Sequence, residues 1–168
     1  MPDPKIFVDP PVNTETGQSV EAERYAPYFL SIINNRLSWG ASQLYLALFG
    51  IGLNEWRILS ALRNEPGIQA QRIGEMVAMN KSVVSRSSRK LEQDGFVHAR
   101  LVGGRRLLWV TERGAEIHDK IITIAYKREE ALLDGFDAAE RDILFSYLSR
   151  MKDNLEKVDR TDREISGK

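Results

Sequence analysis

Apolar residues recur at steps of three and four along much of this chain, which is the spacing of one face of an α-helix. The first such stretch extends from about residue 21 to residue 48. Its end, YLALFGIGL (45–53), is so apolar that it would make a poor solvent-facing surface in a monomer. We therefore expect a further helix, from this chain or from a second subunit, to cover it.

The segment before this helix has a different character. It contains four prolines, which lack a backbone donor and cannot continue a regular helix. Residues 1–20 are therefore predicted to form a flexible, extended arm.

Three shorter helical stretches follow the first helix. Asn54 can cap the first of them, which should finish near Glu65 because Pro66 disfavours helical geometry in the residue before it. The second is predicted over 68–77. A tight turn then leads to the third, NKSVVSRSSRKLEQDGF (80–96).

The third short helix has two distinct sides. Asn80 can cap its start, and Gly95 can take the left-handed conformation at its end. At 100° per residue, the side that must face the core holds Val83, Val84, Ser87 and Leu91. The opposite side holds Lys81, Ser82, Ser85, Arg86, Arg89 and Glu92.

After Gly95 the pattern changes from helical to extended. The runs FVHARLV and RRLLWVT flank Gly103 and Gly104, and two glycines between β-prone runs predict a hairpin with a two-residue loop. Three helices followed by a hairpin are typical of a winged helix-turn-helix.

The remainder of the chain is predicted to be helical. Thr111 can cap a helix that extends to about Leu133. Asp137 and Glu140 then have the spacing of a capping box, which predicts a final helix ending near Val158. The expected fold is therefore mainly α, with a small β-hairpin wing.

Composition excludes several classes of protein. The chain has 168 residues, 42% of them hydrophobic and 29% charged, as expected for a globular protein. No stretch approaches the roughly 20 apolar residues that span a bilayer, and the N-terminus lacks the features of a secretory signal. We therefore expect a cytoplasmic protein without a membrane partner. Without cysteine, disulfides and thiolate chemistry are excluded, and two histidines do not suggest a metal site or a cofactor.

The formal net charge of zero conceals an uneven distribution. Residues 53–113 hold 11 basic and 6 acidic side chains, a net charge of +5. Residues 1–52 hold 3 basic and 5 acidic side chains, and residues 114–168 hold 10 and 13, so both ends are acidic. This asymmetry is expected when one segment meets a polyanion and the others do not.

The exposed side of the third short helix suits the major groove of double-stranded DNA. Small serine side chains let a helix approach base edges, and arginine can make paired hydrogen bonds to guanine. A solvated helix face is the alternative, but the preceding turn, the hairpin and the local charge favour DNA. At the hairpin, Arg105 and Arg106 lie just past the tip, where they could reach the backbone or the minor groove of the same DNA. Solvated arginines are again the alternative.

Three blocks of this sequence, GLNEWRILSAL, IGEMVAMNKSVVSRSSRKLEQDGFV and WVTERG, resemble in order and spacing those of MarR (multiple antibiotic resistance regulator) family transcription factors. The resemblance covers roughly residues 28–155. It implies a bacterial repressor that binds a pseudo-palindromic operator as an obligate homodimer. It also implies the control by a small, often aromatic or phenolic, effector that is frequent in this family. Because the sequence has no cysteine, histidine cluster or phosphate-binding glycine loop, we do not expect an enzyme.

The resemblance also assigns regions and residues. By position, Lys81, Ser82, Ser85 and Arg86, with Arg89 beside them, would lie in the groove, and Arg105 or Arg106 would serve the wing. The expected regions are an arm (1–20), an N-terminal dimerisation helix (21–52), the winged helix-turn-helix (53–113) and C-terminal dimerisation helices (114–168).

The wing departs from the family pattern. The family usually carries Asp-x-Arg at the tip, where the acid positions the arginine, whereas this tip reads LVGGRRLL and has no Asp. Without that partner, we expect Arg105 and Arg106 to make mostly phosphate contacts. The same departure supports a rival hypothesis, a winged-helix protein-interaction adaptor that has lost DNA binding.

Several aromatic residues lie where the resemblance places an effector cavity. Aromatic residues at helical spacing are more often part of a core, so both interpretations stay open. The absence of cysteine excludes a thiol-oxidation switch, so an effector would bind non-covalently. The candidate pocket residues are Tyr28, Trp39, Tyr45, Phe49 and Trp56, with Tyr25 nearby.

Overall fold

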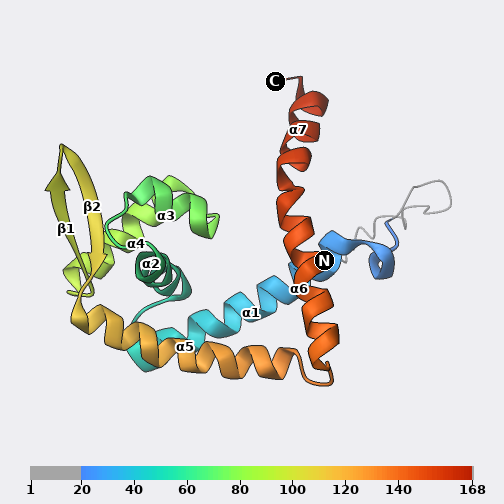
Figure 1. Cartoon of the computed structure of the whole chain (residues 1–168), viewed down its shortest axis with the longest axis horizontal. Coiled ribbons are helices and arrows are strands. Elements are labelled where there is room, and N and C mark those ends of the chain that lie inside the picture. The colour runs from blue at the N-terminus through green and yellow to red at the C-terminus, as the bar shows by residue number, and fades with distance from the viewer. Residues whose placement is uncertain (1–19, 168) are drawn as a thin grey trace, which may run out of the picture. The chain divides into compact units, whose positions relative to one another are not determined.

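The computed structural model describes residues 20–167, and almost all of the predicted arm lies outside them. The chain divides between Leu53 and Asn54 into two compact units. The second unit contains a helical group, α2, α3 and α4, beside the two-stranded hairpin β1–β2, followed by α5, α6 and α7 (Figure 1). This element order confirms the predicted fold class.

The first unit consists mainly of the helix α1 (Ala26–Phe49), preceded by the short 3-10 helix η2 (Ala22–Arg24). The helix begins about five residues later than predicted, because Pro27 occupies its first turn, where a missing backbone donor costs nothing. Gly50 ends it in the left-handed conformation, at φ 71°.

The predicted apolar end of α1 is only partly exposed. Tyr45 and Ile51 are buried, whereas Leu46 and Leu48 each keep more than half of their surface. We therefore still expect a further surface to cover the exposed residues, Leu46 and Leu48.

Three helices form the centre of the second unit: α2 (Leu53–Asn64), α3 (Ala70–Val77) and α4 (Lys81–Gln93). Helix α2 ends before Glu65 and Pro66, as predicted, but it begins at Leu53, so the prediction that Asn54 caps it is wrong. The core lies between these helices and the hairpin. Its fully buried side chains include Ile58, Leu59, Leu62, Ile73, Val84, Leu91 and Leu108.

The start predicted for α3 is wrong by two residues. Ile68 is extended and forms an isolated antiparallel bridge with Leu108 of the hairpin. The Leu108 amide donates to the Ile68 carbonyl at 3.0 Å, and the Gly67 amide donates to the Leu108 carbonyl at 2.9 Å. Pairing with the hairpin thus satisfies backbone groups that an earlier helix start would have used.

Both predicted ends of α4 are confirmed. The Val83 amide donates to Asn80 Oδ1 at 2.9 Å, which caps the first turn. At the other end Gly95 has φ 74°, and the Phe96 amide donates to the Leu91 carbonyl at 2.8 Å. The turn before α4 contains Ala78 in the left-handed region, at φ 52°.

The hairpin consists of β1 (Val97–Val102) and β2 (Arg105–Val110), paired antiparallel. Gly103 and Gly104 form the loop, with φ of 57° and 76°. Positive φ at both loop residues is the requirement of a type I′ turn, so the predicted two-residue loop is confirmed.

The C-terminal helices are α5 (Glu112–Leu132), α6 (Ala138–Asp153) and α7 (Leu155–Ser166). The Thr111 cap of α5 and the capping box of Asp137 and Glu140 are both present. The prediction of one final helix to Val158 is wrong, because Asn154 separates α6 from a further helix. Asparagine is a poor helix former whose side chain competes for local bonds, and here Lys157 Nζ donates to Asn154 Oδ1 at 2.7 Å.

Candidate nucleic-acid interface

Helix α4 presents the outward face that its sequence predicts. Val84, Ser87 and Leu91 are buried, and Val83 is half-buried. The side chains on the opposite face are exposed: Lys81, Ser82, Ser85, Arg86 and Arg89.

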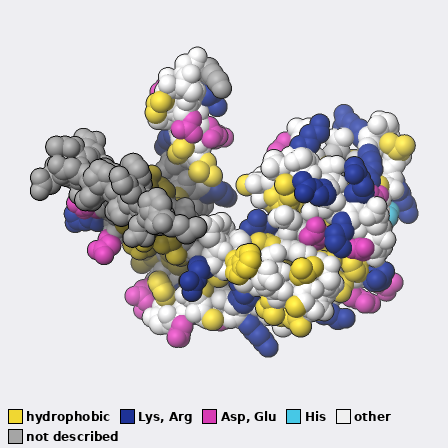
Figure 2. Space-filling model, turned by 180° about the vertical axis from the view of Figure 1, so that it is seen from behind, with side chains coloured by type: hydrophobic (Ala, Val, Ile, Leu, Met, Phe, Trp, Pro, Cys, Tyr) yellow, Lys and Arg dark blue, Asp and Glu magenta, His cyan; other side chains and the backbone are white. Residues whose placement is uncertain are grey.

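The cations on this face are available to a ligand. Within residues 20–167, Lys81, Arg86 and Arg89 have no ion pair, whereas Lys90 on the flank pairs with Asp94 at 2.5 Å. Figure 2 shows Lys and Arg side chains grouped on the winged-helix end of the second unit. Exposed cations without acidic partners attract a polyanion without first losing an ion pair.

The two outward serines differ in their surroundings. Ser82 Oγ donates to Asn80 Oδ1 at 2.8 Å, so it also supports the cap of α4. Ser85 is exposed one turn further on and lines the groove between α3 and α4.

A polar contact with α2 fixes the inner side of α4. Ser87 Oγ donates to Glu55 Oε1 at 2.7 Å, between side chains 32 residues apart in the chain. Ser88 is also buried, and its hydroxyl has no hydrogen-bond partner among the described residues. Small side chains here allow α4 to approach α2 closely. The periodicity located Ser87 on the core side, but it could not identify Glu55 as the acceptor.

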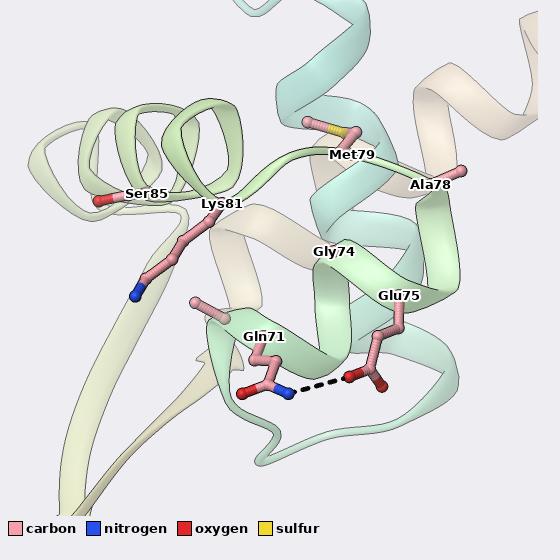
Figure 3. A pocket seen from close by; sticks show the side chains of 8 residues that line it. Gln71, Gly74, Glu75, Ala78, Met79, Lys81 and Ser85 are labelled. Carbon is pink, nitrogen blue, oxygen red and sulfur yellow. Dashed lines mark hydrogen bonds between the residues drawn. The ribbon is translucent and has the colours of Figure 1, made fainter. Parts of the chain in front are cut away.

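A groove of about 530 Å³ lies between α3 and the start of α4 (Figure 3). Gln71 and Glu75 line it from α3, and Gln71 Nε2 donates to Glu75 Oε1 at 3.2 Å. Lys81 and Ser85 line it from α4. Gln71 is therefore a candidate polar contact that sequence reasoning missed, although the four-residue spacing of Gln71 and Glu75 could have indicated it.

Close packing supports the wall of this groove. A Cβ at Gly74 would lie 2.8 Å from the Met79 carbonyl oxygen, so a larger residue would push α3 away from the turn. The turn before α4 therefore depends on glycine at position 74.

The wing arginines have different surroundings. Arg106 Nη2 forms an ion pair with Glu92 Oε2 at the last turn of α4. An acid from α4, rather than one from the wing tip, therefore pairs with Arg106. Arg105 is exposed and has no ion pair within the described part of the chain.

Two of the aromatic residues considered for an effector pocket line hollows in different units. In the first unit, Tyr28 lines a hollow of about 340 Å³ with Tyr25, and Trp39 is 71% exposed. Tyr45 is buried and Phe49 half-buried, and neither lines this hollow. In the second unit, Trp56 lines a cavity between α2 and α5.

The cavity between α2 and α5 has a volume of about 460 Å³. Its wall combines apolar and polar groups, including Trp56, Ser60, His118, Ile122 and Tyr126. Ser60 Oγ is buried and has no hydrogen-bond partner within residues 20–167, so the wall contains an unused polar group.

A short polar chain lies beside this cavity. His118 is buried, and its Nδ1 lies 3.0 Å from Asp119 Oδ1. That hydrogen bond lowers the pKa of the Asp119 carboxyl, and Arg63 lowers it further from 3.6 Å. Asp119 therefore stays ionised beside the histidine.

Residues 20–167 contain neither a candidate metal-ligand cluster nor a helix that could span a membrane. No group of three or more His, Cys, Asp or Glu side chains among them could hold a metal ion. No helix within residues 20–167 is both long enough and apolar enough to cross a membrane.

Comparisons with known proteins identify the winged helix. The sequence model of the MarR family matches residues 51–100, which include α2, α3, α4 and the start of the hairpin. A MarR/EmrR family transcriptional regulator from Acinetobacter sp. ADP1 is 29% identical, with a TM-score of 0.76 over 82% of this chain and 99% of that one. Residues 51–100 of the winged helix therefore match the MarR family model, and the fold around them matches that of a solved MarR/EmrR regulator.

Two further proteins share sequence or fold with this chain. The HTH-type transcriptional regulator YybA of Bacillus subtilis is 24% identical over 61% of this chain and 71% of its own length. The S. aureus MepR–DNA complex shares the fold, with 20% identity and a TM-score of 0.69 over 79% of this chain and 98% of that one. The Acinetobacter and Bacillus relatives are both described as transcriptional regulators.

Proposed function

We propose that this MarR-family protein is a sequence-specific repressor that binds a pseudo-palindromic operator as a homodimer. The observation that carries the proposal is the outward face of α4, where Lys81, Arg86 and Arg89 are exposed without ion pairs beside the small Ser85. Such a face can enter the major groove and present donors to base edges.

The two parts of this face have separate tasks. Because the Ser85 side chain is small, the middle of α4 can approach base edges closely. Arg86 can then make paired hydrogen bonds to guanine. Lys81, Arg89 and the wing residue Arg105 supply charge for phosphates, which orient the protein but carry no sequence information.

Selection of bound genomic DNA fragments by the purified protein tests the proposal. We expect enrichment of one two-fold symmetric sequence at moderate salt, because α4 reads bases while phosphate contacts weaken as salt rises. Recovery of DNA without a common palindrome would overturn it. Binding of no fragment at any salt would favour the adaptor hypothesis, which the ion pair between Arg106 and Glu92 also supports by removing one free cation.

Exposed apolar side chains supply the case for a homodimer. On α1 they include Tyr28, Phe29, Leu30, Ile32, Ile33, Leu46 and Leu48. On α6 and α7 they are Ile143, Phe145, Tyr147, Leu148, Met151, Leu155, Val158 and Ile165. So many exposed apolar side chains on long helices are unfavourable in water, and a second copy of the same chain would cover them.

The cavity between α2 and α5 is the place we propose for an effector. Trp56 and Tyr126 offer aromatic surfaces, and Ser60 Oγ offers an unused polar group to a phenolic hydroxyl or carboxylate. Release of DNA then requires that the effector binds more tightly to a state whose recognition helices misfit the operator.

Titration with phenols and aromatic carboxylates tests this site. Quenching of tryptophan fluorescence that disappears in Trp56→Leu, but persists in Trp39→Leu, would support it. Binding that Trp56→Leu leaves unchanged would move the effector site elsewhere.

A further inference from the structure

The tip of the wing is apolar, although it lies on the same unit as the cationic face of α4. Leu101 is 78% exposed and Val102 is 52% exposed, and both precede the glycine loop. An exposed leucine alone needs no explanation, but two adjacent apolar residues at the end of a projecting hairpin form a small apolar point.

Cations surround this point. The register places Leu101 opposite Arg106 and Val102 opposite Arg105, so each face of the ribbon carries one apolar side chain beside one arginine. Arg100 is also exposed, and Arg100 and Arg105 have no ion pair within residues 20–167. The hairpin, residues 97–110, contains three arginines and no acidic residue. The charge around the tip therefore suits a polyanion.

The loop itself is narrow. Gly103 and Gly104 have no side chains, and no other atom lies within 4 Å of where their Cβ atoms would be. The end of the hairpin is therefore bare backbone flanked by Leu101 and Val102. The minor groove of B-DNA is about 6 Å wide, too narrow for a whole ribbon but open to such a tip.

The wing is also connected to the reading helix. Arg106 at the base of the tip forms its ion pair with Glu92 of α4. A surface ion pair contributes little stability. It does, however, hold the guanidinium of Arg106 toward α4 and leaves Leu101, its cross-strand neighbour, as the exposed side chain on that face.

From these observations we infer that Leu101, with Val102 beside it, is an apolar wedge that enters the DNA minor groove next to each half-site. This inference rests on the proposed DNA binding and replaces phosphate contact alone as the role of the wing. Minor-groove proteins commonly insert apolar side chains between base steps, which partly unstacks and bends the duplex. Arg100 and Arg105 would neutralise the phosphates on either side.

Replacing Leu101 with a cation separates the wedge from simple charge attraction. We would compare wild type with Leu101→Lys, Leu101→Met and Arg105→Gln on the selected operator, with 2-aminopurine placed at each flanking base step. Because Leu101 is largely exposed, these variants should fold, and circular dichroism checks that they do. If the tip contacts only phosphates, Leu101→Lys should bind more tightly.

A wedge predicts the opposite result. Wild type and Leu101→Met should raise 2-aminopurine fluorescence at one flanking step, while Leu101→Lys should lose that signal and bind roughly tenfold more weakly despite its added charge. Arg105→Gln should keep the signal but show a shallower salt dependence.

Two results would overturn the wedge. One is equal or tighter binding by Leu101→Lys, and the other is the absence of a flank signal in wild type. Either would leave the apolar tip to a protein partner while the proposed DNA binding stands. If wild type selects no operator at all, the proposed function itself fails, which is a distinct outcome.

Discussion

Arg86 offers a direct test of base reading, because its side chain faces outward and has no ion pair within the described residues. Replacing Arg86 with Ala should weaken operator binding by about 1–3 kcal/mol and relax the preference at one base pair of each half-site. Competition binding against operators with every single base change measures both effects. Lys127→Ala, on the exposed side of α5, is the matched control that should change neither. Equal weakening on all sequences would reduce Arg86 to a phosphate contact.

The two wing arginines should differ in their contribution to the salt dependence. Arg105→Ala should lower the slope of log affinity against log salt by about one, because it removes a free cation. Arg106→Ala should lower it less, because Glu92 already offsets part of that charge. The double variant should lose affinity about equally for all sequences. If Arg106→Ala lowered this slope more than Arg105→Ala does, Arg106 would have to leave Glu92 and contact DNA in the complex.

At the level of single residues, the sequence predicted which side of α4 is exposed, because helical periodicity is a local property of the chain. It could not predict that Glu92 pairs with Arg106 or that Glu55 accepts from Ser87. Those contacts join residues 14 and 32 positions apart, and only the folded chain brings them together.

Among the elements, α4 depends on its cap. Asn80→Ala removes the acceptor for the Val83 amide and should cost about 1 kcal/mol of unfolding free energy, measured by urea denaturation. Gln93→Ala, exposed in the last turn, is a control that should cost much less. A cost equal to that of the control would show that tertiary packing alone sets the start of α4.

The corner between α5 and α6 should be sensitive to acid. Arg141 donates to Glu130 at 2.8 and 3.0 Å and to the Leu133 carbonyl at 3.3 Å, and the hydrogen bond to Glu130 lowers the pKa of that carboxyl. A lowered folded pKa means that the stabilisation is present above the unfolded pKa and is lost as pH falls through the folded value.

The thermal midpoint of Arg141→Ala should therefore lie below that of wild type at pH 7, and the gap should narrow by about pH 3. The narrowing should be modest, because Glu130 is exposed and solvent screens the pair. Glu130→Gln removes the titrating group, so the difference in thermal midpoint between Glu130→Gln and Arg141→Ala should not vary with pH over this range. A difference in thermal midpoint between wild type and Arg141→Ala that stays constant would show that the hydrogen bonds from Arg141 to the Leu133 and Phe136 carbonyls carry the effect.

The sequence predicted most of the elements because caps and glycine turns act locally. Asn80, Thr111, Asp137 and Gly95 all act as their local chemistry indicates. The misplaced start of α3 has a long-range cause, since Ile68 pairs with a strand 40 residues later.

For the whole molecule, the distribution of exposed apolar residues predicts a dimer that binds its operator with two-fold symmetry. Sedimentation of the free protein should give a species of twice the 19.1 kDa chain mass. Sedimentation with operator DNA should give one dimer per operator. Phe145→Glu on α6 should shift the protein toward monomer by placing charge among the exposed apolar side chains. Glu164→Gln on α7 is the control: it removes a charge where Phe145→Glu adds one, and it should leave the dimer intact. A wild type that sediments as a monomer at micromolar concentration would contradict the dimer.

If the protein reads an operator as we propose, the ion pair between Glu92 and Arg106 would also limit how that operator can change over time. If the reading helix and the wing are tied together, the base pairs that each one meets are separated by a constant number of steps. An operator could then drift by substitution, one base at a time, but a single inserted base pair between the core of a half-site and its flank would put the wing out of phase. Natural binding sites of this protein should therefore differ in base sequence but keep the same spacing between the half-site and its flank.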